Sequence, residues 1–417
     1  MIAAVALMGW LRRPAQPPAI PPSHLAIPLP NLGGAATATF RQLDITPDGT
    51  TLLYTAIAPD GQNRTMRRRL HEIESDVVPG VRPFLSDYRV SPDGTSFVGR
   101  IPPRGALFRY EIGGSGEQRL PLAVEGPWFA WDTDGSIWLS TGIGDQGLMR
   151  IAVDGTTSYP FGDRFPDLVV RQVLEGQRRA LAIRTTRGVS SGPIVLLDIA
   201  GGTGRELVAG DIVDVRYTAG FLVAARPDGA LDAIPFDADE GRVTGPAVRI
   251  AENVGVEQGV AQLAAAPNGT VAYIPEEPRS LVLVDRQGRS RPVSSESRNF
   301  HAPNFSPDGR RIAIDFSTDD GRNVWVMDVE EGVPTRATFD RNGHDPQWTP
   351  DGEGLTYLAD VAGGGVAVFR TRPGSLSSDT VLHGSAVNWT GAWLSDGSAF
   401  VSTAAGLDSE SLGDIVL

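Results

Sequence analysis

Two histidines occupy equivalent places in neighbouring copies of a repeated pattern. His301 begins HAPNFSPDG and His344 begins HDPQWTPDG, so each lies seven residues before the aspartate of a turn. An imidazole can hold a metal ion or exchange a proton near neutral pH, but a metal-dependent lactonase would also need carboxylates converging on the same place. Counting back equally, the other copies carry Arg41, Ser86, Pro127, Leu168, Ile212, Ala261 and Trp389, and none of these is an acid.

We therefore expect no catalytic residue, metal ion or cofactor at these positions. The alternative to a ligand site is a plain structural role at the start of a strand. If a ligand binds, we expect it at the mouth of a central channel where these positions converge. The candidate contacts are His301, His344, Trp389 and Arg41.

Three short motifs match binding or catalytic patterns only by their letters. Gly142–Gly147 spells the dinucleotide pattern and Gly188–Gly192 spells a nucleophile elbow around Ser190. Both segments connect one strand to another, and neither has the helix that its pattern requires. Asp132–Gly135 lacks the downstream ligands of a calcium loop. We interpret all three as turns or hairpin loops.

The histidines belong to a unit that recurs along the chain. In Ser306–Gly309, proline presets φ, aspartate bonds nearby backbone and glycine accepts a positive φ, which together predict a tight turn. Alternating apolar residues follow in RIAIDF, and then come a second turn and a second strand, NVWVMDV. The glycines that end equivalent turns are spaced 40 to 49 residues apart and are Gly49, Gly94, Gly135, Gly176, Gly220, Gly269, Gly309, Gly352 and Gly397.

A large residue three positions before the turn aspartate recurs in the clearest copies, and we expect it to fill the space between sheets. These residues are Ile45, Val90, Trp131, Phe305, Trp348 and Trp393. A period of about 43 residues, with strands about every 8 to 12 residues, is typical of four-stranded propeller blades. The predicted fold class is therefore all-β, a β-propeller with about nine repeats.

Nine copies exceed one six- or seven-bladed ring. A short polar break, Glu276–Pro278, follows the sixth copy. We therefore expect a first six-bladed propeller over residues 35–280 and the start of a second over residues 281–417, with one large ring as the alternative. The last copy stops half made at DIVL, residues 414–417, and a half-made blade leaves an unpaired strand edge. This indicates a piece of a longer protein.

The N-terminus predicts a membrane remnant followed by a stalk. MIAAVALMGWL is apolar but too short to span a bilayer, and its two arginines follow the apolar run, whereas a signal peptide has its positive charge first. Residues 1–13 are interpreted as the end of a transmembrane helix, with a leader as the alternative. Seven prolines between residues 14 and 30 predict an extended stalk, assigned to residues 14–34.

Composition limits the partners. The formal charge of −13 disfavours nucleic acid and anionic membrane surfaces. The one basic run, Arg64–Leu70, falls in a second-strand position, where we expect solvated side chains. The sequence contains no cysteine, which excludes disulfides, thiolate metal sites and a cysteine nucleophile.

The SPDG, strand, turn and strand units resemble the repeats of TolB-type propellers. The wider order also resembles a known arrangement, from the apolar stub with RRP and the proline stalk to PFDADEGRVTGPAVRIAENV at 235–254, LVLVDRQGR at 281–289 and SPDGRRIAIDF. It is similar to the extracytoplasmic half of bacterial membrane-anchored serine/threonine protein kinases. The resemblance implies a kinase domain upstream, whereas this chain contains no VAIK, HRD or DFG motif.

Two classes of function follow. The first is a non-catalytic sensor or interaction domain on the periplasmic side of the inner membrane, anchored only through the N-terminal helix. Its partner would be an unknown protein or small molecule, and a free periplasmic TolB-like scaffold is a variant of this class. The second is the propeller of a hydrolase, either gating a peptidase or acting as a lactonase. We favour the first, because the chain lacks a peptidase domain and the lactonase acids are not expected.

Overall fold

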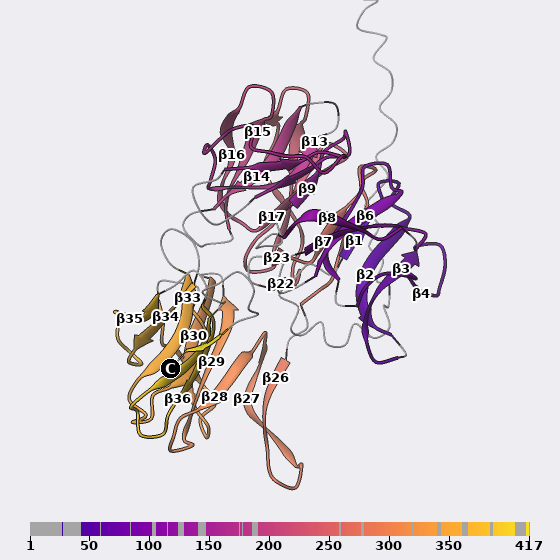
Figure 1. Cartoon of the computed structure of the whole chain (residues 1–417). Helices are drawn as coiled ribbons and strands as arrows, with labels where there is room; N and C mark the ends of the chain where they lie inside the picture. The colour runs from indigo at the N-terminus through magenta and orange to yellow at the C-terminus, as the bar shows by residue number, and fades with distance from the viewer. Residues whose placement is uncertain are drawn as a thin grey trace, which may run out of the picture. The chain divides into compact units, whose positions relative to one another are not determined.

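The structure is a computed structural model of the chain (Figure 1). It describes residues 43–58, 60–83, 85–101, 106–114, 116–123, 129–140, 147–174, 176, 178–185, 191–257, 260–276, 279–318, 321–339, 343–360, 366–383, 387–404 and 414–416, together with Ile27. All regular elements in these ranges are β-strands.

The strands of residues 43–251 form consecutive sheets. They are β1 (Leu43–Ile45), β2 (Thr51–Ile57), β3 (Asn63–Arg69) and β4 (Asp76–Val77); β5 (Ser86–Val90), β6 (Ser96–Ile101), β7 (Ala106–Glu111) and β8 (Gln118–Ala123); β9 (Phe129–Trp131), β10 (Ile137–Leu139), β11 (Met149–Ile151) and β12 (Thr157–Ser158); β13 (Leu168–Leu174), β14 (Arg179–Arg184), β15 (Gly192–Asp198) and β16 (Thr203–Ile212); and β17 (Asp214–Thr218), β18 (Phe221–Ala225), β19 (Leu231–Asp237), β20 (Arg242–Val243) and β21 (Val248–Ala251).

The remaining strands begin with three two-stranded pairs. They are β22 (Val256–Glu257), β23 (Val260–Ala261), β24 (Leu263–Ala265), β25 (Val271–Tyr273), β26 (Arg279–Val284) and β27 (Ser290–Arg298); β28 (His301–Phe305), β29 (Arg311–Thr318), β30 (Gly321–Asp328) and β31 (Pro334–Arg336); β32 (His344–Trp348), β33 (Leu355–Asp360), β34 (Val366–Thr371) and β35 (Asp379–His383); and β36 (Val387–Trp393), β37 (Phe400–Ala404) and β38 (Asp414–Val416).

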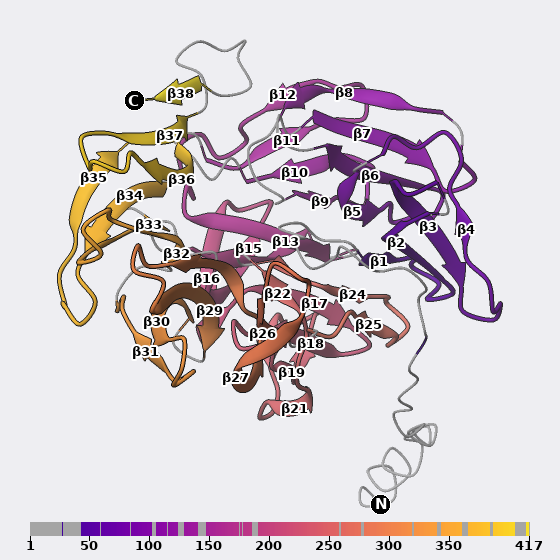
Figure 2. The same cartoon turned by 90° about the horizontal axis from the view of Figure 1, so that it is seen from below.

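The four-stranded sheets are antiparallel meanders, in which strands adjacent in sequence are adjacent in the sheet, while in the five-stranded sheet β21 pairs with β19. Figure 2 shows this order plainly in the sheet formed by β5, β6, β7 and β8. Such sheets are the expected blades, and the predicted all-β propeller class is confirmed. The assignment of residues 35–280 and 281–417 to two rings remains a prediction.

The turn between the first two strands of a blade is built as its sequence predicts. In the turn after β28, the Ser306 hydroxyl donates to Asp308 Oδ1 at 2.6 Å, and the same oxygen accepts the backbone N–H of Arg310 at 3.1 Å. Gly309 has φ of 71°, a left-handed value that costs glycine little. The same geometry recurs at residues 46–49, 91–94 and 349–352.

The apolar core lies between neighbouring blades. One cluster joins Val98 and Leu107 of the β5–β8 blade to Phe129 and Ile137 of the β9–β12 blade. Each fully buried side chain of this size contributes about 1.5–3 kcal/mol of transfer free energy. Because a blade buries both faces only against its neighbours, the blades depend on one another for stability.

The repeated aromatic position links consecutive blades by hydrogen bonds as well as by packing. The Trp131 indole N–H donates to the carbonyl of Arg89 at 2.8 Å, and the Trp348 indole N–H donates to that of Asn304 at 3.2 Å. Both indoles are buried, as predicted, and Ile45 is buried too.

One member of this set does not follow the prediction. Phe305 is 49% exposed, whereas the sequence predicted that it fills the space between sheets. Val90 and Trp393 are half-buried. A recurring apolar residue therefore marks the register of the strand, but burial also requires a neighbouring element over that face.

Contacts between the first strands follow the order of the chain. β1 contacts β5, β5 contacts β9, β9 contacts β13, β13 contacts β17 and β17 contacts β24, while β24 contacts β1 in turn. A hydrogen bond from the Asn268 amide to the carbonyl of Asp48, 2.9 Å long, joins the same two ends. In the C-terminal part, β28 contacts β32 and β32 contacts β36.

The basic run Arg64–Leu70 corrects a second prediction. The structure buries Arg68, which is 7% exposed and pairs across the ladder with Leu52, although solvated side chains were expected. On the same strand, Arg67 Nη1 donates to the carbonyl of Ile112 at 3.1 Å. An internal strand of a blade is buried by the neighbouring blade as well as by its own sheet. The residue types of the strand alone do not predict this burial.

The predicted membrane remnant and proline stalk, residues 1–34, lie outside the described residues except for Ile27. In the part of the chain that is described, no helix is long and apolar enough to cross a membrane.

Candidate functional site

The two predicted histidines begin the first strands of adjacent blades. His301 is the first residue of β28 and pairs with Asp315 of β29, while His344 is the first residue of β32. The ladder register shifts directly after each histidine. The next residues, Ala302 and Asp345, have φ of 45° and 51°, an uncommon conformation for residues with a side chain. A bulge therefore re-aims the start of each strand.

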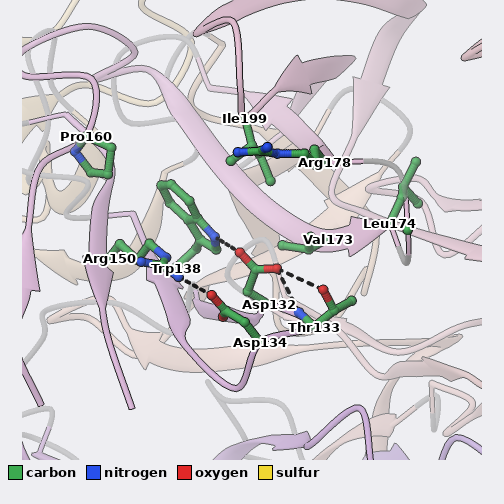
Figure 3. A pocket seen from close by; sticks show the side chains of 11 residues that line it. Asp132, Thr133, Asp134, Trp138, Arg150, Pro160, Val173, Leu174, Arg178 and Ile199 are labelled. Atoms are coloured by element: carbon green, nitrogen blue, oxygen red, sulfur yellow. Dashed lines mark hydrogen bonds and ion pairs between the residues drawn. The ribbon is translucent and has the colours of Figure 1, made fainter. Parts of the chain in front are cut away.

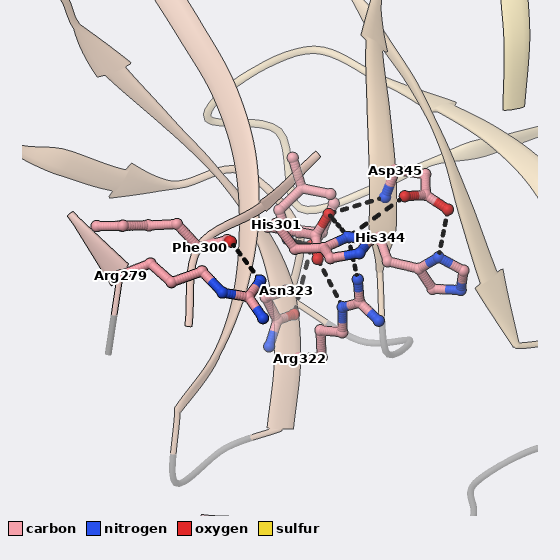
Figure 4. Close-up of polar contacts among 10 residues, drawn as sticks. Arg279, Phe300, His301, Arg322, Asn323, His344 and Asp345 are labelled. Carbon is pink, nitrogen blue, oxygen red and sulfur yellow. Dashed lines mark hydrogen bonds and ion pairs between the residues drawn. The ribbon is translucent and has the colours of Figure 1, made fainter. Parts of the chain in front are cut away.

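Two carboxylates meet His301 at this place. Figure 4 shows the labelled one, Asp345, beside His301. His301 Nδ1 lies 3.6 Å from Asp315 Oδ1 in its own blade and 3.6 Å from Asp345 Oδ1 in the next blade. The backbone N–H of Asp345 donates to Asp315 Oδ1 at 3.0 Å. The bulged residue of one blade is thus tied to the second strand of its neighbour.

A guanidinium completes this arrangement. Arg322 of β30 donates from Nε to Asp315 Oδ2 at 2.6 Å and lies with Nη2 2.7 Å from His301 Nδ1. Asp315 is fully buried and Arg322 is 9% exposed. Arginine has no acceptor, so Nδ1 must accept this hydrogen bond and the imidazole proton then lies on Nε2.

His344 approaches the cluster from the other side. Its Nδ1 lies 3.2 Å from Asp345 Oδ2, and its side chain is buried. Asp345 therefore lies between the two histidines, with one oxygen directed to each. We call His301, Asp315, Arg322, His344 and Asp345 the inter-blade cluster.

The charges in this cluster move two pKa values in opposite directions. Asp315 raises the pKa of His301 above 6.5, with help from Asp345, against burial and the positive charge of Arg322. Burial would raise the pKa of Asp345, but His344, Arg322 and His301 together bring it below 3.8. Apart from the two histidines, the cluster holds two negative charges and one positive charge.

The sequence predicted part of this site and missed its acids. His301 and His344 lie where expected and are connected through Asp345. The expectation that no carboxylate converges there is wrong. It compared only the residues at the histidine position of each repeat and did not consider the following residue or the paired strand. Asp345 comes directly after His344, and Asp315 comes from RIAIDF on the paired strand.

The other two predicted contacts add nothing to this geometry. Trp389 belongs to β36, next to β32, but its side chain lies outside the described residues. Arg41 lies outside them as well.

Of the three short motifs that match binding or catalytic patterns only by their letters, one can be compared with the structure. Asp132–Gly135 forms the predicted turn, in which Asp132 Oδ2 accepts the indole N–H of Trp138 at 2.9 Å. The segment Gly188–Gly192 and the loop before Gly147 fall largely outside the described residues.

This turn borders a surface hollow of about 470 Å³ between the β9–β12 and β13–β16 blades (Figure 3). Its acidic side chains are engaged with neighbouring residues, since Asp134 pairs with Arg150 and Asp132 also accepts the N–H of Thr133. The hydroxyl of Thr133 lies 3.4 Å from Asp132 Oδ1, the same oxygen that accepts the Thr133 backbone N–H, so this contact belongs to the turn. The residues that line the hollow are Asp132, Thr133, Asp134, Trp138, Arg150, Pro160, Val173, Leu174, Gly176, Arg178 and Ile199.

Comparison with known families supports the repeat assignment. Residues 265–413 match the family described as the TolB beta propeller domain, and these residues include the inter-blade cluster. Residues 265–413 therefore carry TolB-type β-propeller repeats. No curated protein sequence matches it.

Among solved structures, the chain is similar to the tricorn protease, with a TM-score of 0.41 and 10% identity over 90% of this chain and 43% of that one. It thus spans less than half of the tricorn protease chain. It is also similar to an oligogalacturonate lyase in complex with manganese, with a TM-score of 0.30 and 14% identity over 81% of this chain and 92% of that one. A third is the putative TolB from Agrobacterium tumefaciens, with a TM-score of 0.20 and 14% identity over 82% and 79% of the two chains.

Proposed function

We propose that this chain is a non-catalytic sensor or protein-interaction propeller on the extracytoplasmic side of a bacterial inner membrane. We further propose that it belongs to a membrane-anchored serine/threonine protein kinase. The TolB-type repeats supply a rigid scaffold. Support for the kinase connection comes from the order of apolar stub, proline stalk and repeat variants in the sequence.

The observation that carries the binding role is the inter-blade cluster. His301 and Asp345, from the starts of two neighbouring blades, converge on one buried carboxylate, Asp315. Strand ends on a rigid scaffold are places where recognition residues gather. A ligand that engages this cluster would contact two blades at once, and the packing between them would respond.

The chemistry of the cluster fits binding better than turnover. Its five side chains are two imidazoles, two carboxylates and one guanidinium, and this set holds no hydroxyl or thiol nucleophile. Asp315, which could act as a base, is already engaged by Arg322 and by the backbone of Asp345. A nucleophilic mechanism needs a nucleophile within hydrogen-bond reach of its base.

The first test is an activity screen of the purified chain. We expect no hydrolysis of p-nitrophenyl acetate or of a lactone, and no phosphoryl transfer from ATP, above the buffer rate. Each assay is run with and without added ZnCl₂. Turnover that disappears in the double variant His301→Ala, His344→Ala would overturn the proposal in favour of a hydrolase.

The second test concerns the parent protein. The reading frame upstream of Met1 should encode HRD and DFG motifs of a kinase domain followed by the first part of a membrane helix. A cleavable leader in their place would contradict the kinase connection and favour a free periplasmic scaffold.

A further inference from the structure

The inter-blade cluster has more negative than positive charge in a largely buried place. Asp315 and Asp345 bring two carboxylates, and Arg322 is the one permanent cation among the five cluster residues. Asp315 is fully buried, and the Asp345 side chain is 21% exposed. Uncompensated charge is costly in such surroundings, so the cluster favours one additional positive charge.

We propose that His301, Asp315 and Asp345 bind one divalent transition-metal ion, with Zn²⁺ as the best fit, and that this ion links the two blades. The inference rests on the proposed role of the cluster as the binding site of the propeller. It gives that site a ligand of defined chemistry.

The distances suit such an ion. The three candidate ligand atoms, one from each residue, lie within 4.8 Å of one another. His301 Nδ1 is 3.6 Å from each carboxylate oxygen. Two ligands of a tetrahedral zinc ion, each bound at about 2.0–2.2 Å, are about 3.4 Å apart. Small side-chain shifts are therefore enough to bring the three atoms around one ion.

The donor types select the class of ion. Imidazole nitrogen and carboxylate oxygen are both zinc ligands, whereas calcium takes six to eight oxygen ligands and magnesium keeps several of its water ligands. Three protein ligands also leave a coordination position for water or for a group of a partner molecule.

Arg322 would compete with a metal ion for His301 in this site. Its Nη2 uses the lone pair of His301 Nδ1 that a metal would need. Its Nε, however, contacts Asp315 Oδ2, while the proposed ligand atom is Oδ1. Metal binding therefore requires release of one guanidinium contact and leaves the main ion pair in place.

The experiment uses the tag-free full chain, dialysed against a chelator and then into metal-free buffer. Calorimetric titration with ZnCl₂ should show one saturable site per chain, and zinc should raise the thermal midpoint, since a ligand that binds only the folded state stabilises it. CaCl₂ at the same concentration should give no saturable binding. Absence of saturable zinc binding would overturn the proposal.

Variants locate the ion. His301→Gln should lower the zinc affinity by at least about tenfold, and Asp345→Asn should do the same. The control is His71→Gln, because the His71 side chain is 72% exposed and lies outside the cluster. An equal loss in the His71 control, or unchanged affinity in His301→Gln, would place the ion elsewhere and contradict the inference.

A third variant addresses the competitor. Arg322→Gln should keep or raise the zinc affinity, because it removes a positive charge and frees His301 Nδ1. Circular dichroism checks that it still folds, and Asp345→Asn remains decisive if it does not. A loss of affinity as large as that of His301→Gln would mean that the guanidinium is required, which would overturn the assignment.

Failure of this inference is separate from failure of the proposed function. If zinc does not bind, the metal-site inference is wrong, and the outcome of the activity screen is not affected. If the activity screen detects turnover, the proposed non-catalytic function is wrong, whether or not zinc binds.

Discussion

In the β17–β21 sheet one carboxylate lies between two arginines, whereas in the inter-blade cluster two carboxylates share one arginine. Asp232 accepts from Arg226 Nε at 2.7 Å through one oxygen and from Arg249 Nε at 2.7 Å through the other. Asp315 accepts from Arg322 Nε at 2.6 Å, and Asp345 lies between His301 and His344. Both places use the same residue types, in opposite proportions.

The difference separates a structural ion pair from a candidate binding site. Both oxygens of Asp232 are occupied, its own charge is more than balanced, and both of its arginines reach solvent at 34% and 44% exposure. In the inter-blade cluster the arginine is only 9% exposed and the two carboxylates give an excess of negative charge, so a proton or a cation stabilises the cluster. Stability measurements can therefore distinguish the two places.

The largest expected effect concerns packing between the blades that carry the cluster. Trp348→Ala should lower the free energy of unfolding by about 3–5 kcal/mol, because a large buried indole and its hydrogen bond to Asn304 are lost. Urea titration followed by circular dichroism measures the change. A small effect would mean that the β28 and β32 blades do not depend on this contact.

Asp315→Ala comes next, at about 3–5 kcal/mol in the absence of zinc, because it leaves the Arg322 guanidinium buried without its carboxylate. Leu358→Ala, a buried residue of the next blade that is opposite His344, is a control for simple loss of packing. If the free energies of unfolding of the two variants depend on salt in the same way, the charge of Asp315 does not contribute to stability. The contrast between the inter-blade cluster and the Asp232 ion pair would then be wrong.

Asp232→Asn should cost less, about 1–2 kcal/mol at neutral pH, since Arg226 and Arg249 can turn to water. Burial raises the pKa of Asp232, but the two arginines outweigh burial and hold this pKa below 3.8. A lowered pKa gives stability that is present above the unfolded value and is lost as pH falls through the folded value. The difference between wild type and Asp232→Asn should therefore shrink in acid, and a constant difference would contradict this account.

His301 should show the opposite pH dependence in chelator-treated protein. Its pKa is raised, chiefly by Asp315, so its contribution to stability is complete below about pH 6.5 and is lost as pH rises through the folded pKa. The stability advantage of wild type over His301→Gln should decrease with increasing pH in urea titrations. An advantage that grows with pH would show that Arg322, rather than the carboxylates, dominates this histidine.

The smallest effect is expected at an exposed ion pair. Arg291 Nη2 lies 3.0 Å from Glu330 Oε1, with side-chain exposures of 47% and 82%. Glu330→Ala should change the free energy of unfolding by less than about 0.5 kcal/mol, since exposed pairs gain little in water. A cost near that of Asp232→Asn would mean that burial does not explain the contrast between the pairs.

Local sequence determined the turns, the strands and their period. The Ser306–Gly309 type of turn needs only its own side chains and one glycine with positive φ, so it could be predicted wherever the letters recur. The same period placed His301 and His344 at strand starts and put Trp348 in the core. These features depend on residues within a few positions of each other.

Tertiary structure decided which faces are covered and which charges meet. Phe305 is exposed and Arg68 is buried because burial depends on the neighbouring blade, which alternation along one strand does not describe. Asp315 and Asp345 are 30 residues apart in sequence and meet only because β28 and β32 lie side by side with a bulge at each start. The sequence supplied the two histidines, and the packing of one blade on the next supplied the carboxylates around them.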